Sequence, residues 1–296
     1  MTPSTGSFLK QYINRQAPRL KRGVALAKGD PALFVRKLIL KLELLFIRRN
    51  TSKIKRIHGV KFRFDLSYDP AIRLMYVGGY EIETIRTMRE LLHPGDTFID
   101  IGANIGYISA IALGLVGEEG SVHAFEPVPE YFKRLTDFKE LNPDHAVIVN
   151  NIALGEERGV SQIAVSDYSN IGWNTMVSGY MANRMLKETI KVHVMTLDEY
   201  ISENNLDAVS LIKIDTEGYE YYVLKGMSGF LTHARTKPAI LCEINAAAYQ
   251  FTAHSLEDLD LLVKEFGYRS VDVTKRHDPV SIPSLTTNTD VLLLPE

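Results

Sequence analysis

The chain has one cysteine, one tryptophan and no long apolar run among its 296 residues. A single cysteine, Cys242, excludes an internal disulfide framework and any zinc site built on several thiolates. The eight histidines show no metal-ligand spacing, and the first thirty residues lack the apolar core of a cleavable signal peptide. The simplest expectation is a reducing, cytoplasmic setting, with Cys242 as an inert core residue.

Acidic residues are scarce in the first 63 positions. This stretch holds 16 Lys and Arg against Asp30 and Glu43, a net charge of +14, while residues 64–296 carry 18 basic and 34 acidic side chains. Such a division predicts a basic arm that meets something anionic. Few aromatic residues interleave these charges, which argues against nucleic acid as the partner.

Residues 33–49 of this arm have a helical pattern, with Pro31 near its start. The pattern is too short and too charged for a bilayer span. We expect a basic helical extension over residues 1–52, with two open alternatives. In the first, residues 31–56 lie on an anionic membrane surface at the cytoplasmic face. In the second, the helix docks on its own domain or on a second subunit of a homo-oligomer. The helix would have a broad apolar face of Phe34, Val35, Leu38, Ile39, Leu42, Leu45 and Phe46. A cationic stripe consists of Lys37, Lys41 and Arg48. A second apolar arc, which favours burial, consists of Leu33, Leu40, Leu44 and Ile47.

The rest of the chain alternates strand and helix patterns. This order is typical of a mostly parallel sheet with helices on both faces, and we expect one domain over residues 53–296. Segments 160–165 and 189–195 indicate an additional antiparallel pair around an irregular loop.

A glycine turn stands where an expected strand meets a helix. The strand pattern at residues 98–101 runs into a turn that contains Gly102, Asn104 and Gly106, and a helical pattern begins at Tyr107. Such a turn brings backbone close to a ligand and points free N–H groups at it. The third glycine of a dinucleotide fingerprint is absent, and so is the Lys-Ser or Lys-Thr pair of a phosphate loop. What remains suits a nucleoside that carries an amino acid, which points to S-adenosylmethionine.

An acid ends the next expected strand. Glu126 follows the pattern at 121–125, roughly 20 residues past the turn, where a carboxylate accepts hydrogen bonds from both hydroxyls of a ribose. We therefore expect Glu126 to bind the cofactor ribose. Asn151, after the following strand, is expected at the adenine edge, with turn formation as the alternative.

Five motifs follow one another along the chain: Asp100–Gly106, Phe125–Pro127, Asn151–Gly155, Thr196–Asp198 and Ile212–Glu220. They occur in the order seen in FkbM-type methyltransferases, and the chain resembles that family over roughly residues 54–296, with Ile212–Glu220 as the motif most specific to it. The resemblance implies a Rossmann-like class I methyltransferase fold with a seven-stranded sheet, S-adenosylmethionine as cofactor, and O-methylation of sugars, glycans or related metabolites. It also implies that Asp100 lies in the cofactor site and Glu81 near the amino-acid end of the cofactor, a plain helix-start acid being the alternative.

Acids follow two neighbouring expected strands at the edge where the cofactor binds. Asp215 and Glu217 come after the strand at 210–214, and Glu243 lies near the end of the strand at 239–244. Transfer of a methyl group to a hydroxyl requires positioning and an acceptor for the hydroxyl proton. We expect Asp215 to be the base, Glu243 the second choice, and Glu217 part of the same catalytic group. A divalent cation on Asp215 and Glu243, or a structural hydrogen-bond network, are the alternatives.

The loop at 167–175 is the expected acceptor site. Tyr168 and Trp173 would form an apolar platform for a sugar or another ring, with Asn174 beside them. The alternative is a surface loop pinned by one buried tryptophan. A non-catalytic binding module that works through the basic arm is the competing function, but the intact acid series favours an enzyme. The sequence assigns no role to Lys213.

Overall fold

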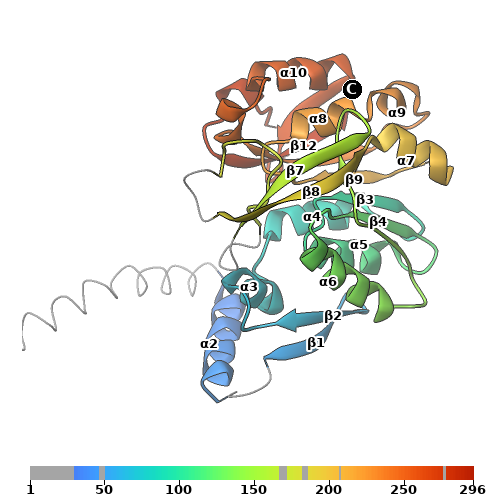
Figure 1. The fold of residues 1–296 in the computed structure, drawn as a ribbon. Helices are drawn as coiled ribbons and strands as arrows, with labels where there is room; N and C mark the ends of the chain where they lie inside the picture. Colours follow the sequence, from blue (N-terminus) through green and yellow to red (C-terminus); the bar gives the residue numbers. More distant parts are fainter. Residues whose placement is uncertain (1–29, 47–50, 167–171, 182–185, 207, 276–277) are drawn as a thin grey trace, which may run out of the picture. The chain divides into compact units, whose positions relative to one another are not determined.

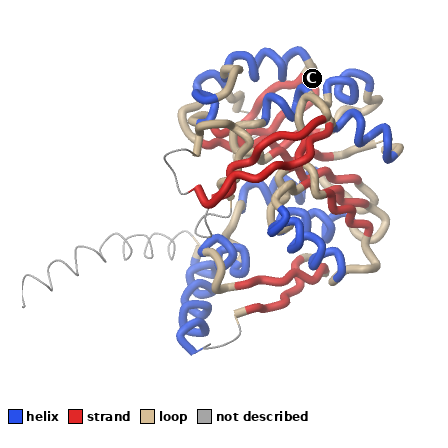
Figure 2. Tube along the Cα trace, in the orientation of Figure 1, coloured by secondary structure: helices blue, strands red, loops and turns tan. Residues whose placement is uncertain are grey.

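The computed structural model describes residues 30–46, 51–166, 172–181, 186–206, 208–275 and 278–296. The chain divides into two units. The first consists of Met1–Lys53 and Phe64–Tyr80, and the second of Ile54–Arg63 and Glu81–Glu296. Figure 1 draws the elements and Figure 2 their secondary structure. Among the described residues, no helix combines the length and the apolar character needed to cross a membrane.

The first unit pairs two helices. α2 (Pro31–Phe46) begins where Asp30 accepts the N–H of Leu33 at 2.8 Å, which confirms a helix in the basic arm. It packs on α3 (Pro70–Val77), which the sequence patterns missed. α3 has a full set of end signals, since Asp69 accepts an N–H of its first turn, Pro70 opens it and Gly78 closes it at a positive φ.

The two apolar arcs of α2 have different surroundings. Leu33 and Leu40, from the second arc, are buried, and Leu33 lies against Gly79. Val35, Leu38 and Ile39, from the broad apolar face, are 50%, 48% and 51% exposed. Packing within the unit therefore uses the second arc and leaves these three side chains open to a partner.

A seven-stranded sheet forms the frame of the second unit, in the order β11-β12-β10-β9-β3-β4-β5. The five strands from β10 to β5 run parallel, and β12 runs antiparallel to both of its neighbours. The predicted mostly parallel seven-stranded sheet is thus confirmed. Its strands are β3 (Thr97–Ile101), β4 (Ser121–Phe125), β5 (Ala146–Asn150), β9 (Leu211–Ile214), β10 (Ala239–Asn245), β11 (Tyr268–Asp272) and β12 (Asn288–Pro295).

Helices cover both faces of this sheet (Figures 1 and 2). The pleat of β3 sends Ile99 and Ile101 into one large apolar core and Asp100 to the opposite face, where it meets Ser109. The Asp100 face carries α4 (Ile82–Leu91), α5 (Tyr107–Val116) and α6 (Pro129–Glu140), and the other face carries α7 (Leu197–Asn204), α8 (Glu220–Lys225), α9 (Ser228–His233) and α10 (Leu256–Glu265). Cys242 is buried in the same large apolar core as Ile99 and Ile101, as expected.

Two smaller sheets flank this frame. β1 (Ser52–Ile57) and β2 (Val60–Asp65) form a hairpin, and Phe62 of β2 packs on the ring of Tyr107. β6 (Ala153–Leu154), β8 (Leu186–Met195) and β7 (Gly159–Ser166) form the third sheet in that order. The antiparallel pairing of β7 with β8 confirms the additional pair expected from the sequence. Two short 3-10 helices, η1 (Ala248–Phe251) and η2 (Ile282–Ser284), complete the unit.

Candidate active site

The glycine turn after β3 depends on a close backbone approach. Gly102 and Gly106 have φ of +80° and +85°, and Asn104 shares this left-handed conformation. A Cβ at Gly102 would lie 1.9 Å from the carbonyl oxygen of Asp215, so no side chain fits there. The Asp215 N–H also donates to the Ile101 carbonyl at 3.0 Å. The turn and the loop after β9 therefore form one continuous wall.

The Glu126 carboxylate lies over this turn, at the end of β4. It accepts the N–H of Asn104 at 2.9 Å and that of Val128 at 2.8 Å. Burial raises the pKa of Glu126 to about 7, against the opposing effect of these two N–H groups. Asn151 donates to the carbonyls of Glu126 and Pro127 at 2.9 and 3.0 Å, so its amide ties the strand ends together. Its role at an adenine edge stays a prediction.

A cavity of about 580 Å³, counted with its open mouth, lies at the carboxyl ends of β3 and β4. Gly102, Asn104, Glu126 and Asp215 supply its polar side. The opposite side is largely apolar and comes from Ile152, Ala153, Leu154, Ile163, Met176 and Tyr219.

Charged side chains form a row across the same end of the sheet. The strand register pairs Asp100 of β3 with Lys213 of β9, and Glu243 of β10 with Asp290 of β12. Lys213 Nζ lies 2.8 Å from Asp215 Oδ2. Burial lowers the pKa of Lys213, but the surrounding carboxylates outweigh it and hold this pKa well above its ordinary value. Within the described part of the chain, Lys213 is the one buried lysine or arginine.

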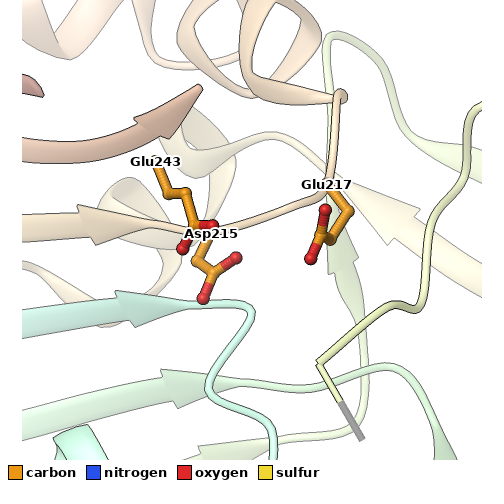
Figure 3. A group of neighbouring side chains, drawn as sticks. All are labelled: Asp215, Glu217 and Glu243. Atoms are coloured by element: carbon orange, nitrogen blue, oxygen red, sulfur yellow. The ribbon is translucent and has the colours of Figure 1, made fainter. Parts of the chain in front are cut away.

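Figure 3 shows the three expected catalytic acids: Asp215 and Glu217 on the loop after β9, and Glu243 on β10. One carboxylate oxygen from each lies within 4.8 Å of the others. The charge of Asp215, together with burial, raises the pKa of Glu243, and burial together with Asp215 raises that of Glu217. The structure thus brings the three acids together, with a spacing that can hold either shared protons or a divalent cation.

Glu217 is held by two side chains that the sequence patterns did not single out, Asn245 and Thr175, and Tyr180 in turn holds Asn245. Asn245, the last residue of β10, donates to Glu217 Oε2 at 2.6 Å and to the Tyr180 hydroxyl at 2.9 Å. The Thr175 hydroxyl donates to the Glu217 carbonyl at 2.7 Å. Glu217 itself has a φ of +52°, a strained conformation for this residue. A polar residue ending a buried strand, such as Asn245, was the available sequence signal.

Asp100 and Glu81 add two more acids beside Lys213. Asp100 Oδ2 accepts the Ser109 hydroxyl at 2.5 Å, but its fully buried Oδ1 has no hydrogen-bond partner among the described residues. Glu81 precedes α4 with a φ of +45°. Burial raises the pKa of Asp100, and it raises that of Glu81 to about 7. The buried Asp100 Oδ1 could therefore accept a hydrogen bond from a cationic donor.

The three residues expected to bind the methyl acceptor have different outcomes in the structure. Tyr168 lies outside the described residues. Trp173 is 43% exposed, so it is not a buried pin. Asn174 lines the cavity, and its Oδ1 accepts the N–H of Ser166 at 3.0 Å, which fixes the loop to β7.

A family model for the methyltransferase FkbM domain matches residues 100–270, more than half of the chain. The chain belongs to the FkbM methyltransferase family. It is an S-adenosylmethionine-dependent methyltransferase with a Rossmann-like class I fold, and the glycine turn and acid cluster both lie inside the matched region.

Two curated relatives extend the comparison. The chain is 27% identical to the hexuronic acid methyltransferase AglP of Haloferax volcanii over 179 residues, which cover 60% of this chain and 69% of the relative. It is 30% identical to the 31-O-demethyl-FK506 methyltransferase FkbM of Streptomyces tacrolimicus over 160 residues, or 46% of this chain and 61% of the relative.

Similar solved structures are more distant in sequence. They include a SAM-dependent methyltransferase from Aquifex aeolicus, at 13% identity and a TM-score of 0.39, covering 77% of this chain and 93% of that one. Aeropyrum pernix fibrillarin with bound S-adenosyl-L-methionine matches at 12% identity and a TM-score of 0.39, covering 83% and 84%.

Proposed function

We propose that this methyltransferase, through a catalytic domain of residues 53–296, methylates a hydroxyl group of a sugar, glycan or related metabolite, with Asp215 as the base. The observation that carries the proposal is the position of Asp215, which lines the cavity at the carboxyl ends of β3 and β4 and lies beside Glu217 and Glu243. The names of the two relatives, which refer to a hexuronic acid and to a 31-O-demethyl compound, support an oxygen-rich acceptor.

The residues around the cavity fit S-adenosylmethionine. The buried Asp100 Oδ1 without a partner and the nearby Glu81 carboxylate suit its ammonium group. Glu126 suits the two ribose hydroxyls, and the turn from Gly102 to Gly106, with its left-handed Asn104, lets backbone come close to the ligand. Asn151 would position the Glu126 strand end.

Asp215 and Glu243 of the cluster then have distinct tasks in the reaction. S-adenosylmethionine, when bound, supplies an electrophilic methyl group. Asp215 accepts the proton of the acceptor hydroxyl, and the Lys213 ammonium 2.8 Å away orients that carboxylate. Glu243 retains a proton near neutral pH, because Asp215 raises its pKa, and it therefore donates a hydrogen bond rather than acting as the base. Trp173 and Asn174, and Tyr168 of the same loop, would contact the acceptor.

The Asp215→Asn variant tests the assignment. We expect kcat to fall by about 10²–10⁴-fold, the usual contribution of a positioned base, while the affinity for S-adenosylhomocysteine stays within about threefold of wild type. Calorimetry gives the affinity, and transfer of label from S-adenosylmethionine to sugar and glycan extracts gives kcat. Full turnover in the variant would contradict the role of Asp215.

A divalent cation bridging Asp215 and Glu243 is the competing hypothesis for the same cluster. Dialysis against EDTA separates the two. If Asp215 acts as the base, activity survives the chelator, and added Mg²⁺ changes it little. Loss of activity that Mg²⁺ restores would transfer the role of the cluster to a metal.

The basic arm supports a second function, contact with an anionic membrane through residues 31–56. The observation that favours it is the exposure of Val35, Leu38 and Ile39 on a helix rich in cationic residues. Flotation with anionic liposomes should recover the full-length protein but not a version without residues 1–52. Equal flotation of both would rule this contact out, and a self-association assay would then test the homo-oligomer.

A further inference from the structure

Glu220 is a buried acid to which the proposed reaction gives no task. It is the first residue of α8, belongs to the same motif as Asp215, and is 0% exposed. A carboxyl group is taken out of water only at a high cost unless hydrogen bonds compensate it. The hydrogen bonds of Glu220 therefore indicate its role.

One oxygen of this carboxyl group binds the segment 216–218, which follows the proposed base. Glu220 Oε1 accepts the N–H of Gly218 at 2.7 Å and the Thr216 hydroxyl at 3.2 Å. Thr216 lines the cavity at the carboxyl ends of β3 and β4, beside Asp215. Glu220 thus holds the segment from its buried side.

The segment has a backbone conformation that depends on such support. Glu217 and Gly218 have consecutive φ values of +52° and +102°, and the first is unfavourable for a residue with a side chain. Gly218 is buried, and a Cβ on it would lie 2.3 Å from that of Ala248. Without the oxygen of Glu220 the N–H of Gly218 would be buried without an acceptor, which favours movement of the backbone.

The position of the segment determines where two of the catalytic acids point. The N–H of Asp215 is fixed to the Ile101 carbonyl at 3.0 Å, whereas its carbonyl side continues directly into the segment. Glu217 lies within the segment, close to Asp215 (Figure 3). A shift of the backbone here would therefore move both carboxylates, and a displacement of about 1 Å can slow an enzyme about 10²-fold.

The second oxygen of Glu220 does not bind the segment. Glu220 Oε2 and the Tyr249 hydroxyl are buried and have no hydrogen-bond partner among the described residues. Burial and the neighbouring Glu220 charge hold the pKa of Tyr249 well above its ordinary value, so this hydroxyl keeps its proton. Because a hydroxyl can accept as well as donate, a glutamine amide fits here, with its oxygen in place of Oε1 and its nitrogen in place of Oε2.

We propose that Glu220 is a positioning residue for methyl transfer, which holds the segment 216–218, and with it the carboxylates of Asp215 and Glu217, in the geometry that the reaction requires. The inference rests on the proposed function, because it concerns the acids of the same site. Since Glu220 is fully buried, it contacts neither substrate. The reaction needs its acceptor atom Oε1 and not its charge.

Two substitutions of similar length separate the acceptor atom from the charge. Glu220→Gln and Glu220→Met both remove the charge, but only Glu220→Gln keeps an acceptor oxygen. We expect kcat, measured by transfer of label from S-adenosylmethionine to sugar and glycan extracts, to stay within about threefold of wild type in Glu220→Gln and to fall at least about tenfold in Glu220→Met. The affinity for S-adenosylhomocysteine, measured by calorimetry, should stay within about threefold in both, because Glu220 is not among the described residues that line the cavity.

Hydrogen exchange tests the support of the segment without a methyl acceptor. In full-length protein saturated with S-adenosylhomocysteine, mass spectrometry should show faster exchange in the peptide that contains the Gly218 amide for Glu220→Met, but not for Glu220→Gln. Equal protection in the two variants would contradict the support.

Asp198→Leu is the matched control, because it removes a carboxyl group of the same kind elsewhere. The half-buried Asp198 accepts the N–H groups of Gly229 and Phe230 at 2.8 and 2.7 Å, at the start of α9, and it is not among the described residues that line the cavity. Asp198→Leu should lower the Tm, as Glu220→Met does, but kcat of the folded protein should stay within about threefold of wild type.

Glu220→Asp keeps the comparison possible if Glu220→Met does not fold. It retains the charge, but its carboxyl group is one methylene shorter and withdraws the acceptor from Gly218, so kcat should again fall at least about tenfold. Wild-type kcat in either folded variant, or equal losses of kcat in Glu220→Gln and Glu220→Met, would overturn the inference and leave the proposed function intact. Wild-type protein that transfers no label to sugar or glycan extracts would instead overturn the proposed function, and the inference with it.

Discussion

Lys213 is the residue whose surroundings matter most to the chemistry. It is 5% exposed and lies among Asp100 and Glu243 of the two neighbouring strands, Asp215 of the loop after β9, and Glu81. A buried lysine without partners would tend to lose its proton, but these carboxylates keep it charged. It therefore offsets part of a large local negative charge, and it orients Asp215 through the 2.8 Å ion pair.

Replacement of Lys213 should change the pH dependence of methyl transfer. In Lys213→Met the carboxylates lose their counter-charge and hold protons more strongly, so the acidic limb of the kcat profile should move up by about one pH unit or more. Lys213→Arg keeps the charge and should stay closer to wild type. The measurement is kcat between about pH 6 and 10 on protein whose fold is verified by circular dichroism.

A purely structural Lys213 predicts a different outcome. Activity of Lys213→Met would then fall by the same factor at every pH, without a shift of the profile. Because loss of one partner of a buried ion pair costs about 3–5 kcal/mol, the arginine variant is needed as the folded comparison.

The acids of the site were predictable from the sequence, but their partners were not. Asp215, Glu217 and Glu243 follow apolar runs, and the carboxyl ends of parallel strands meet at one edge. Lys213 instead lies inside an apolar run, and its acidic neighbours become visible only with the strand register. Tyr180 reaches Asn245 across 65 positions of sequence, and no local pattern encodes that contact.

Several helix ends carry signals that are visible in the sequence. α7 opens with a capping box in which Thr196 and Glu199 each bind the backbone of the other, and α10 opens the same way at Ser255 and Asp258. α3 was missed although Asp69 and Gly78 mark both of its ends. β1 was missed because its side chains are exposed or half-buried and do not alternate.

Thr196→Ala should destabilise α7. The substitution removes the acceptor for the Glu199 N–H, and such caps contribute about 1 kcal/mol, so we expect the Tm to fall by about 2–4 °C. Differential scanning calorimetry at constant pH measures this change. Thr232→Ala is the control, since the Thr232 hydroxyl only donates to the Ser228 carbonyl within its own helix. Equal effects of both would contradict the capping role.

At the scale of the whole molecule, buried acids oppose stability as pH rises. Burial raises the pKa of Glu81, Glu126 and Glu220 to about 7 each. Their unfolded values lie near the ordinary 4.5, so the native state binds more protons between about pH 4.5 and 7. Stability is therefore greatest at the acidic end of this window and decreases as the pH increases through it.

The Tm of the ligand-free protein should fall by several degrees between about pH 5 and 7.5. Each raised group removes up to about 1.4 kcal/mol per pH unit. Thermal unfolding across this range gives the slope, and Glu220→Gln, which cannot titrate, should flatten it. A Tm that rises over the interval would contradict the effect of burial.

The seven-stranded sheet was more predictable from the sequence than the segments that pack around it. Apolar strands between helical patterns indicate a parallel sheet, and the order β11-β12-β10-β9-β3-β4-β5 has the expected seven strands. The path of residues 175–181 along β7 was not predictable, because two backbone hydrogen bonds between Ala164 and Thr175 determine it.

The missing side chain at Gly102 has a thermodynamic consequence. The turn that approaches the cofactor and the backbone of the proposed base touch at that point, where even a methyl group would lie 1.9 Å from the Asp215 carbonyl oxygen. A ligand that orders the glycine turn therefore also orders the backbone of Asp215, and the conformational entropy of these two segments is lost only once. Occupancy by the first substrate should then increase the affinity for the second, and by linkage each should assist the other equally.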